Sequence, residues 1–122
     1  MCREIYTWAI LNQRRWPCLQ WLHKIENEGK RDPKVAHEIG ILTGVSDYFW
    51  PAPTARFHGL YLEVKKPGET PTRAQSRWLR HMRKLGFRAE YVDTLQSAFM
   101  ILETHAREAT KWMKENNIAI LD

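Results

Sequence analysis

The sequence lacks the features that mark secreted and membrane proteins. No stretch approaches the roughly 18 consecutive apolar residues of a transmembrane helix, and no signal-peptide pattern opens the chain. The two cysteines, Cys2 and Cys18, lack the spacing of a metal site and are too few to staple a small fold. We therefore expect a cytoplasmic protein with reduced thiols and no membrane span.

Internal repeats, low-complexity segments and domain linkers are also missing. The 122 residues suit one domain, and an apolar content of 43% provides for a hydrophobic core and argues against a disordered chain. We expect a single domain over residues 1–122, whose last part, about 104–122, is a helical extension.

What the chain does have is positive charge and tryptophan. Its 19 Lys and Arg against 14 Asp and Glu give a net charge of +5. This balance favours a polyanionic partner such as nucleic acid, although many basic proteins bind nothing in particular. Most of the six tryptophans should be core residues, whereas exposed ones could stack on bases or anchor a subunit contact.

The hydrophobic pattern predicts helices and strands in a mixed order. Helices are expected over 3–16, 32–42, 72–85 and 94–105, with a further helical stretch over 107–117 that can continue the last one. Strands are expected over 46–50, 57–66 and 87–92, and an alternating extended segment over 19–25. Two adjacent strands followed by a crossover helix into a third predict an α/β fold, with a mixed sheet between helices on both faces.

Two acids and a lysine stand near strand ends in this arrangement. Asp47 closes the segment Gly44-Val45-Ser46-Asp47, and Glu63-Val64-Lys65 ends an apolar run. Glu63 and Lys65 leave the same face of their strand, roughly 6.6 Å apart. Val64 points into the core, while its carbonyl stays available near the strand end.

If the two strands pair, the Asp47 and Glu63 carboxylates and the Val64 carbonyl form an all-oxygen set suited to Mg²⁺ or Mn²⁺. Two carboxylates about 5 Å apart repel by roughly 3 kcal/mol at an effective dielectric constant near 20, and a cation relieves this repulsion. Lys65 could orient a water molecule or stabilise charge on a phosphate. The alternative is that Glu63 and Lys65 form a charged rim and pair with each other.

Gln75 lies on the helix face predicted to meet the sheet, together with Trp78, Leu79 and Met82. A buried amide needs hydrogen-bond partners, and the carboxylates at the strand ends are the nearest candidates. Alternatively, Gln75 caps the first turn of its helix.

Basic residues form two groups. One is a stripe along the opposite face of the same helix, and the other lies near a turn at residues 27–29. Such a stripe is either a solvated face or a contact to the phosphate backbone. The residues that we expect to contact DNA are Lys30, Arg31, Lys34, Lys66, Arg73, Arg77, Arg80 and Lys84.

Over about residues 4–100 the chain resembles the VRR-NUC domain, the virus-type replication-repair branch of the PD-(D/E)XK nucleases. The resemblance is carried by Glu4, the segment His23–Gly29, the segment Gly44–Asp47, Glu63-Val64-Lys65, and Gln75 before Trp78-Leu79. Standalone phage-type members are the most similar, which implies a bacterial or phage-infected host cell.

The resemblance implies a restriction-endonuclease-like core and a DNA-repair endonuclease that uses Mg²⁺ or Mn²⁺. It implies a homodimer acting on branched DNA such as Holliday junctions. Asp47 and Glu63 match the metal-binding acids, Lys65 the catalytic lysine, and Gln75 the glutamine after the core strands. Glu4 matches a first-helix acid that approaches the metal, although it could equally be a solvated residue favoured by the helix dipole.

Two departures from the family pattern stand out. The family often has proline where this chain has Ser46, and usually has one where Glu26 stands. His23 falls on the apolar face of its predicted segment and is interpreted as a core histidine. Two other functions stay open: a DNA-binding module without catalysis, and a nuclease with another substrate, such as a flap or RNA.

Overall fold

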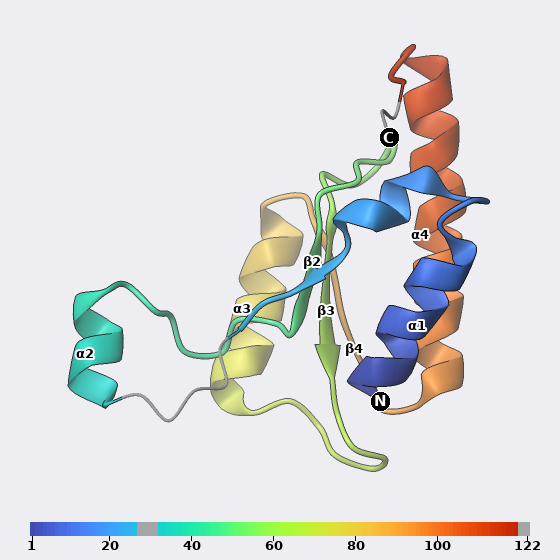
Figure 1. Ribbon diagram of the computed structural model, residues 1–122. Coiled ribbons are helices and arrows are strands. Elements are labelled where there is room, and N and C mark those ends of the chain that lie inside the picture. The colour runs from blue at the N-terminus through green and yellow to red at the C-terminus, as the bar shows by residue number, and fades with distance from the viewer. Residues whose placement is uncertain (27–31, 120–122) are drawn as a thin grey trace.

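A mixed β-sheet lies between two layers of helices (Figure 1). The computed structural model describes residues 1–26 and 32–119. The strands are β1 (His23–Lys24), β2 (Tyr48–Trp50), β3 (Leu60–Val64) and β4 (Arg88–Val92). The helices are α1 (Cys2–Asn12), the 3₁₀ helix η1 (Pro17–Trp21), α2 (Pro33–Glu38), α3 (Arg73–Lys84) and α4 (Leu95–Glu115).

The four strands follow one another across the sheet in the order β1-β2-β3-β4. β2 is antiparallel to β1 and to β3, while α3 crosses over so that β4 runs parallel to β3. Tyr48 pairs with Leu62, so the start of β2 meets the end of β3. The predicted mixed sheet flanked by helices is confirmed, and this pairing positions the acids discussed below.

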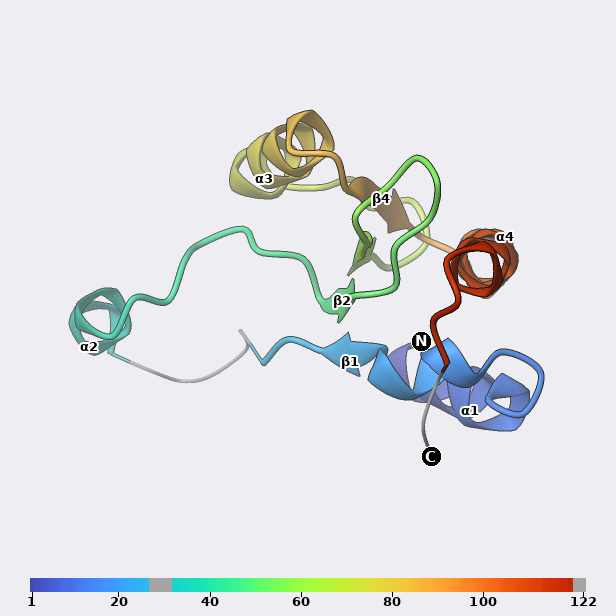
Figure 2. The same ribbon diagram turned by 90° about the horizontal axis from the view of Figure 1, so that it is seen from above.

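Helices α1 and α4 cover one face of the sheet and α3 covers the other, while α2 stands apart (Figures 1 and 2). Leu60 and Leu62 of β3 are buried in the same cluster as Ile5 of α1 and Leu102 of α4. Tyr61, between them, packs edge-on against Trp78 of α3 at 5.4 Å. Successive β3 side chains therefore face opposite layers, which sends Glu63 toward α3.

Local signals in the sequence set the ends of α3. Thr72 caps the first turn by accepting a hydrogen bond from the Gln75 N–H. At the other end Gly86 has φ +95°, and the Phe87 N–H donates to the Met82 carbonyl at 3.0 Å. This is a Schellman motif, in which Gly86 supplies the positive φ that ends the helix.

The predicted extended segment over residues 19–25 is wrong in most of its length. Residues Pro17–Trp21 form η1, and only His23–Lys24 pair as a strand. The Trp50 indole N–H donates to the Cys18 carbonyl at 2.8 Å in the core, which ties this segment down as a tight turn. His23 is exposed, with Nδ1 at 2.9 Å from the Trp21 carbonyl, so its interpretation as a core histidine is also wrong.

Other boundaries shift without changing the topology. The first helix ends at Asn12, and α2, which Asp32 caps, ends at Glu38. The two predicted C-terminal helical stretches form one helix, α4, which runs without a break to Glu115. In the part of the chain that is described, no helix has both the length and the apolar character needed to cross a membrane.

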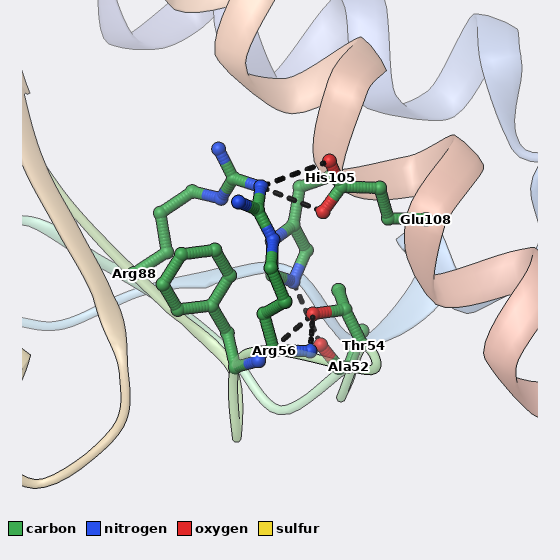
Figure 3. A network of polar contacts seen from close by, with 7 residues as sticks. Ala52, Thr54, Arg56, Arg88, His105 and Glu108 are labelled. Carbon is green, nitrogen blue, oxygen red and sulfur yellow. Dashed lines mark hydrogen bonds and ion pairs between the residues drawn. The ribbon is translucent and has the colours of Figure 1, made fainter.

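A polar network ties the loop between β2 and β3 to α4 at the end of the sheet away from Glu63 (Figure 3). The Arg88 guanidinium pairs with Glu108 at 2.8 Å, and Arg56 reaches the same carboxylate at 3.6 Å. His105 is fully buried, and its Nε2 donates to the Ala52 carbonyl at 2.7 Å. The network therefore fixes where β2 leaves the core.

We expect His105 to make the fold sensitive to acid. The pKa of His105 is lowered from 6.5 to about 4, mainly by burial and also by Arg88, while the hydrogen bond to the Ala52 carbonyl and the charge of Glu108 act in the opposite direction. Between these two pKa values the unfolded chain binds a proton that the folded chain does not. The free energy of unfolding should therefore fall on the order of 3 kcal/mol as the pH drops from about 7 to about 4.

Urea unfolding at neutral and acidic pH would measure this loss. His105→Asn keeps an N–H donor but does not titrate, so its unfolding free energy should fall less with pH than that of the wild type. An equal fall in both proteins would contradict the assignment.

Candidate active site

Two carboxylates meet where the start of β2 lies beside the end of β3. Tyr48 pairs with Leu62, so Asp47, one residue earlier, lies opposite Glu63, one residue later. Opposing side chains in an antiparallel pair have Cβ atoms about 5 Å apart. Both acids are buried, with exposed fractions of 7% and 3%. Glu63 therefore does not belong to a solvated rim.

A backbone hydrogen bond orients the first acid. Asp47 Oδ2 accepts a hydrogen bond from the Val64 N–H at 2.7 Å. The carboxylate takes the place of a β2 carbonyl here, because β2 begins one residue later. The N–H and C=O of one strand residue point to the same side. The Val64 carbonyl therefore points toward the Asp47 side of β3, while its side chain packs against the core as expected.

Gln75 combines the two roles that the sequence left as alternatives. Its Oε1 accepts from the Thr72 N–H at 2.9 Å and completes the capping box of α3. Because the oxygen is committed to the cap, the amide Nε2 is turned toward the sheet, where it donates to Glu63 Oε1 at 3.3 Å. The start of α3 thereby fixes the orientation of the second acid.

The carboxylates line a cavity of about 430 Å³ at the end of β3. Lys65 and Lys66 line it from the segment that leaves the strand, and residues 41–45 form the facing wall. Glu69 also lines it, on a turn closed by a hydrogen bond from its N–H to the Lys66 carbonyl at 2.9 Å. Glu69 was not predicted from the sequence. Its position on a proline-flanked turn directly after the strand is the signal that could have identified it.

The donor set fits a hard divalent cation. Asp47 and Glu63 offer carboxylate oxygens, and Val64 offers a carbonyl oxygen. Mg²⁺ typically keeps several waters and takes only one or two carboxylates from the protein. Over the described ranges 1–26 and 32–119, no three His, Cys, Asp or Glu side chains gather into a metal-binding group. A cation here would therefore depend on these three protein oxygens and on water.

Glu4 lies outside this cavity. It sits in the first turn of α1, half exposed, with its carboxylate 3.1 Å from the Met1 amine. A backbone hydrogen bond and that amine lower the pKa of Glu4. The same end of α1 approaches β2, because the Tyr48 hydroxyl donates to the Cys2 carbonyl at 3.1 Å. Glu4 occupies the solvated position considered as its alternative, and its approach to a metal stays a prediction.

The predicted DNA-contacting residues are distributed around α3 and α2. Lys66 lines the acidic cavity, and Arg73 and Arg77 line a neighbouring groove. Arg80 and Lys84 are exposed farther along α3. Lys34 is exposed at the start of α2, away from the sheet. Lys30 and Arg31, with residues 27–29 of the family segment, lie outside the described residues.

Gly44 brings the wall of the cavity against α3. It has φ +88°, and a Cβ at this position would lie 2.6 Å from the carbonyl carbon and oxygen of Ala74. We expect Gly44→Ala to displace the loop that leads into Asp47, in addition to the backbone strain of about 1–3 kcal/mol for a non-glycine residue at this φ. The unfolding free energy should therefore fall.

Gly40→Ala provides a matched control, because Gly40 has φ +84° with no atom within 4 Å of the added Cβ. Urea unfolding of both variants separates backbone strain from the contact with Ala74. Equal losses in the two variants would show that the close approach to α3 is unimportant.

Comparisons with known proteins agree with the fold. No protein-family profile matches the chain, and no curated protein matches it. A solved structure described as a "VRR_NUC domain protein" superposes with a TM-score of 0.69 at 19% sequence identity, covering 86% of this chain and 87% of that one. The protein therefore shares the mixed-sheet fold of a VRR_NUC domain.

Proposed function

We propose that this protein is a Mg²⁺- or Mn²⁺-dependent nuclease that hydrolyses phosphodiester bonds in DNA. The observation that supports it best is the meeting of two buried acids from different strands in a cavity that Lys65 also lines. The similar structure described as a VRR_NUC domain protein supports the same class of function. A divalent cation at this site would supply Lewis-acid activation of water and of the phosphate.

The residues of the chain then have distinct tasks. Asp47 and Glu63, with the Val64 carbonyl, would hold the cation. Gln75 donates to Glu63 and keeps that carboxylate turned toward the cavity. The Lys65 ammonium donates hydrogen bonds to the attacking water or to the phosphate and stabilises the negative charge that develops during attack.

Branched DNA such as a Holliday junction is the proposed substrate, and cleavage is endonucleolytic. This choice rests on the resemblance to standalone VRR-NUC proteins and on the positive charge around the cavity. Lys66, Arg73 and Arg77 lie beside it, and Arg80 and Lys84 extend the charge along α3. These side chains would contact phosphates without reading sequence.

A substrate panel tests the function directly. Purified protein is incubated with blunt duplex, single-stranded, flap and four-way DNA and with RNA, in Mg²⁺, in Mn²⁺ or in EDTA. We expect cleavage of branched DNA that requires the divalent ion. DNA that is bound but stays intact in both metals would instead support a DNA-binding module, and preferential cleavage of RNA or flaps would correct the substrate.

A homodimer follows from the same resemblance, because cutting both strands of a junction symmetrically needs two active sites. Three large apolar side chains of α1, those of Tyr6, Ile10 and Leu11, are exposed by 64%, 50% and 76%. Trp21, exposed by 42%, is a tryptophan that could anchor such a subunit contact.

Light scattering should therefore give twice the mass of one chain, and Leu11→Glu should lower it to that of one chain. Met100→Glu places the same charge at another exposed apolar position, 62% exposed on α4, and should leave the mass unchanged. A monomeric wild type at micromolar concentration would contradict the dimer.

A further inference from the structure

A second hollow lies beside the acidic cavity, along the flank of α3. It is a groove of about 720 Å³. The residues that line it are Leu42, Thr43, Arg73, Ala74, Arg77, Trp78, His81 and Met82. It is larger than the acidic cavity, and the proposed hydrolysis does not use it.

The chemistry of the groove is the opposite of that of the cavity. Leu42, Trp78 and Met82 contribute large apolar side chains to its lining, and none of the described residues that line it is acidic. Arg73, Arg77 and His81 follow one another at four-residue intervals, which places them in a row along one side of the helix. Neither arginine forms an ion pair within the described part of the chain. An apolar floor with a free cationic rim suits a ligand that is both flat and anionic.

The groove adjoins the proposed active site. Leu42 and Thr43 line both hollows, so the same piece of backbone forms a wall of each. On α3, Gln75 faces the cavity while Ala74, its neighbour in sequence, faces the groove. A DNA strand that leaves the cavity therefore reaches the groove by passing over residues 42 and 43.

We propose that this groove binds unpaired nucleotides of the DNA adjacent to the scissile phosphate. The proposal rests on the nuclease function proposed above. Bases would pack on Trp78, Met82 and Leu42, and Arg73 and Arg77 would hold the phosphates between them, as in other sites for single strands. A base can reach the apolar floor only after leaving its stack, because paired bases keep their faces covered. The groove therefore selects branched DNA whose nucleotides are unpaired at the branch point beside the cut over continuous duplex.

Binding in EDTA tests the groove independently of catalysis. Fluorescence anisotropy would compare a duplex that carries a single-stranded extension with a blunt duplex of the same length. The double variant Arg73→Gln/Arg77→Gln should lose about tenfold or more in affinity for the extended DNA and only a few-fold for the blunt DNA. Arg80→Gln/Lys84→Gln removes the same charge from α3 outside the groove. It should lower the affinity for both DNAs by the same small factor.

Leu42→Ser tests the apolar wall without changing charge. Leu42 is 62% exposed, so its truncation should leave the fold intact. Affinity should fall for the extended DNA alone. The proposal is overturned if Arg73→Gln/Arg77→Gln lowers the affinity for both DNAs by the same factor, or if Leu42→Ser leaves both affinities unchanged. If the variants bind DNA as expected but the wild type never cleaves it, the nuclease function is refuted and the groove proposal stands. If the wild type cleaves DNA but the variants do not bind as expected, only the groove proposal is refuted.

Discussion

Replacing Asp47 by asparagine should lower metal-dependent DNA cleavage by roughly 10³-fold or more, the equivalent of about 4 kcal/mol in the activation barrier. The substitution removes one of the two charges that would hold the cation, and asparagine is a poor ligand for Mg²⁺. Its side-chain oxygen can still accept the hydrogen bond from the Val64 N–H, which Asp47 accepts at 2.7 Å. The fold should therefore survive while cleavage is lost.

Asp93→Asn is the matched control. Asp93 also accepts a hydrogen bond from a backbone N–H, that of Gly68 at 3.1 Å, but it does not line the cavity. Single-turnover cleavage rates and thermal unfolding of both variants would be compared. Cleavage by folded Asp47→Asn within a few-fold of the wild-type rate would remove Asp47 from the site.

Lys65→Met should also abolish cleavage, with a loss of roughly 10²- to 10³-fold in the rate of the chemical step. Methionine keeps much of the length and apolar stem of the lysine but cannot donate a hydrogen bond or carry charge. Mn²⁺ binding should persist, because the two carboxylates stay in place and one neighbouring positive charge is gone. Loss of catalysis with retained metal binding is the pattern that separates Lys65 from Asp47.

Lys66→Met removes the same charge one residue later in the same cavity. We expect it to weaken DNA binding, and to leave the rate at which bound substrate is cleaved within a few-fold of the wild-type rate. Calorimetric titration with Mn²⁺ and single-turnover assays would be applied to both variants. If Lys65→Met loses Mn²⁺ binding, or if the two variants have similar rates, the catalytic role of Lys65 is wrong.

The close approach of the acids was predictable because it depends on short-range patterns. The alternation along β3 and the Gly44–Asp47 segment placed Asp47 and Glu63 at strand ends, and antiparallel pairing then brought them together. Gln75 was predictable from helix periodicity. Its two roles looked like alternatives in the sequence, whereas the amide has an oxygen and a nitrogen and uses one for each.

The errors lie where tertiary contacts override local patterns. Leu19 and Trp21 alternate with polar residues like a strand, yet Leu19 is 3% exposed and Trp21 42% exposed within a 3₁₀ turn. The hydrogen bond from Trp50 to Cys18 spans 32 positions, and no local pattern encodes it. Glu69 was missed for a related reason, since its place beside the cavity depends on how the turn after β3 folds back.

Crystallography of the protein soaked with Mn²⁺ would test the central claim most directly, through the anomalous scattering of the ion. We predict an anomalous peak between the Asp47 and Glu63 carboxylates, about 2.1 Å from an oxygen of each and from the Val64 carbonyl, and no peak there in Asp47→Asn. A peak bound elsewhere, or none between these carboxylates at saturating Mn²⁺, would contradict the account.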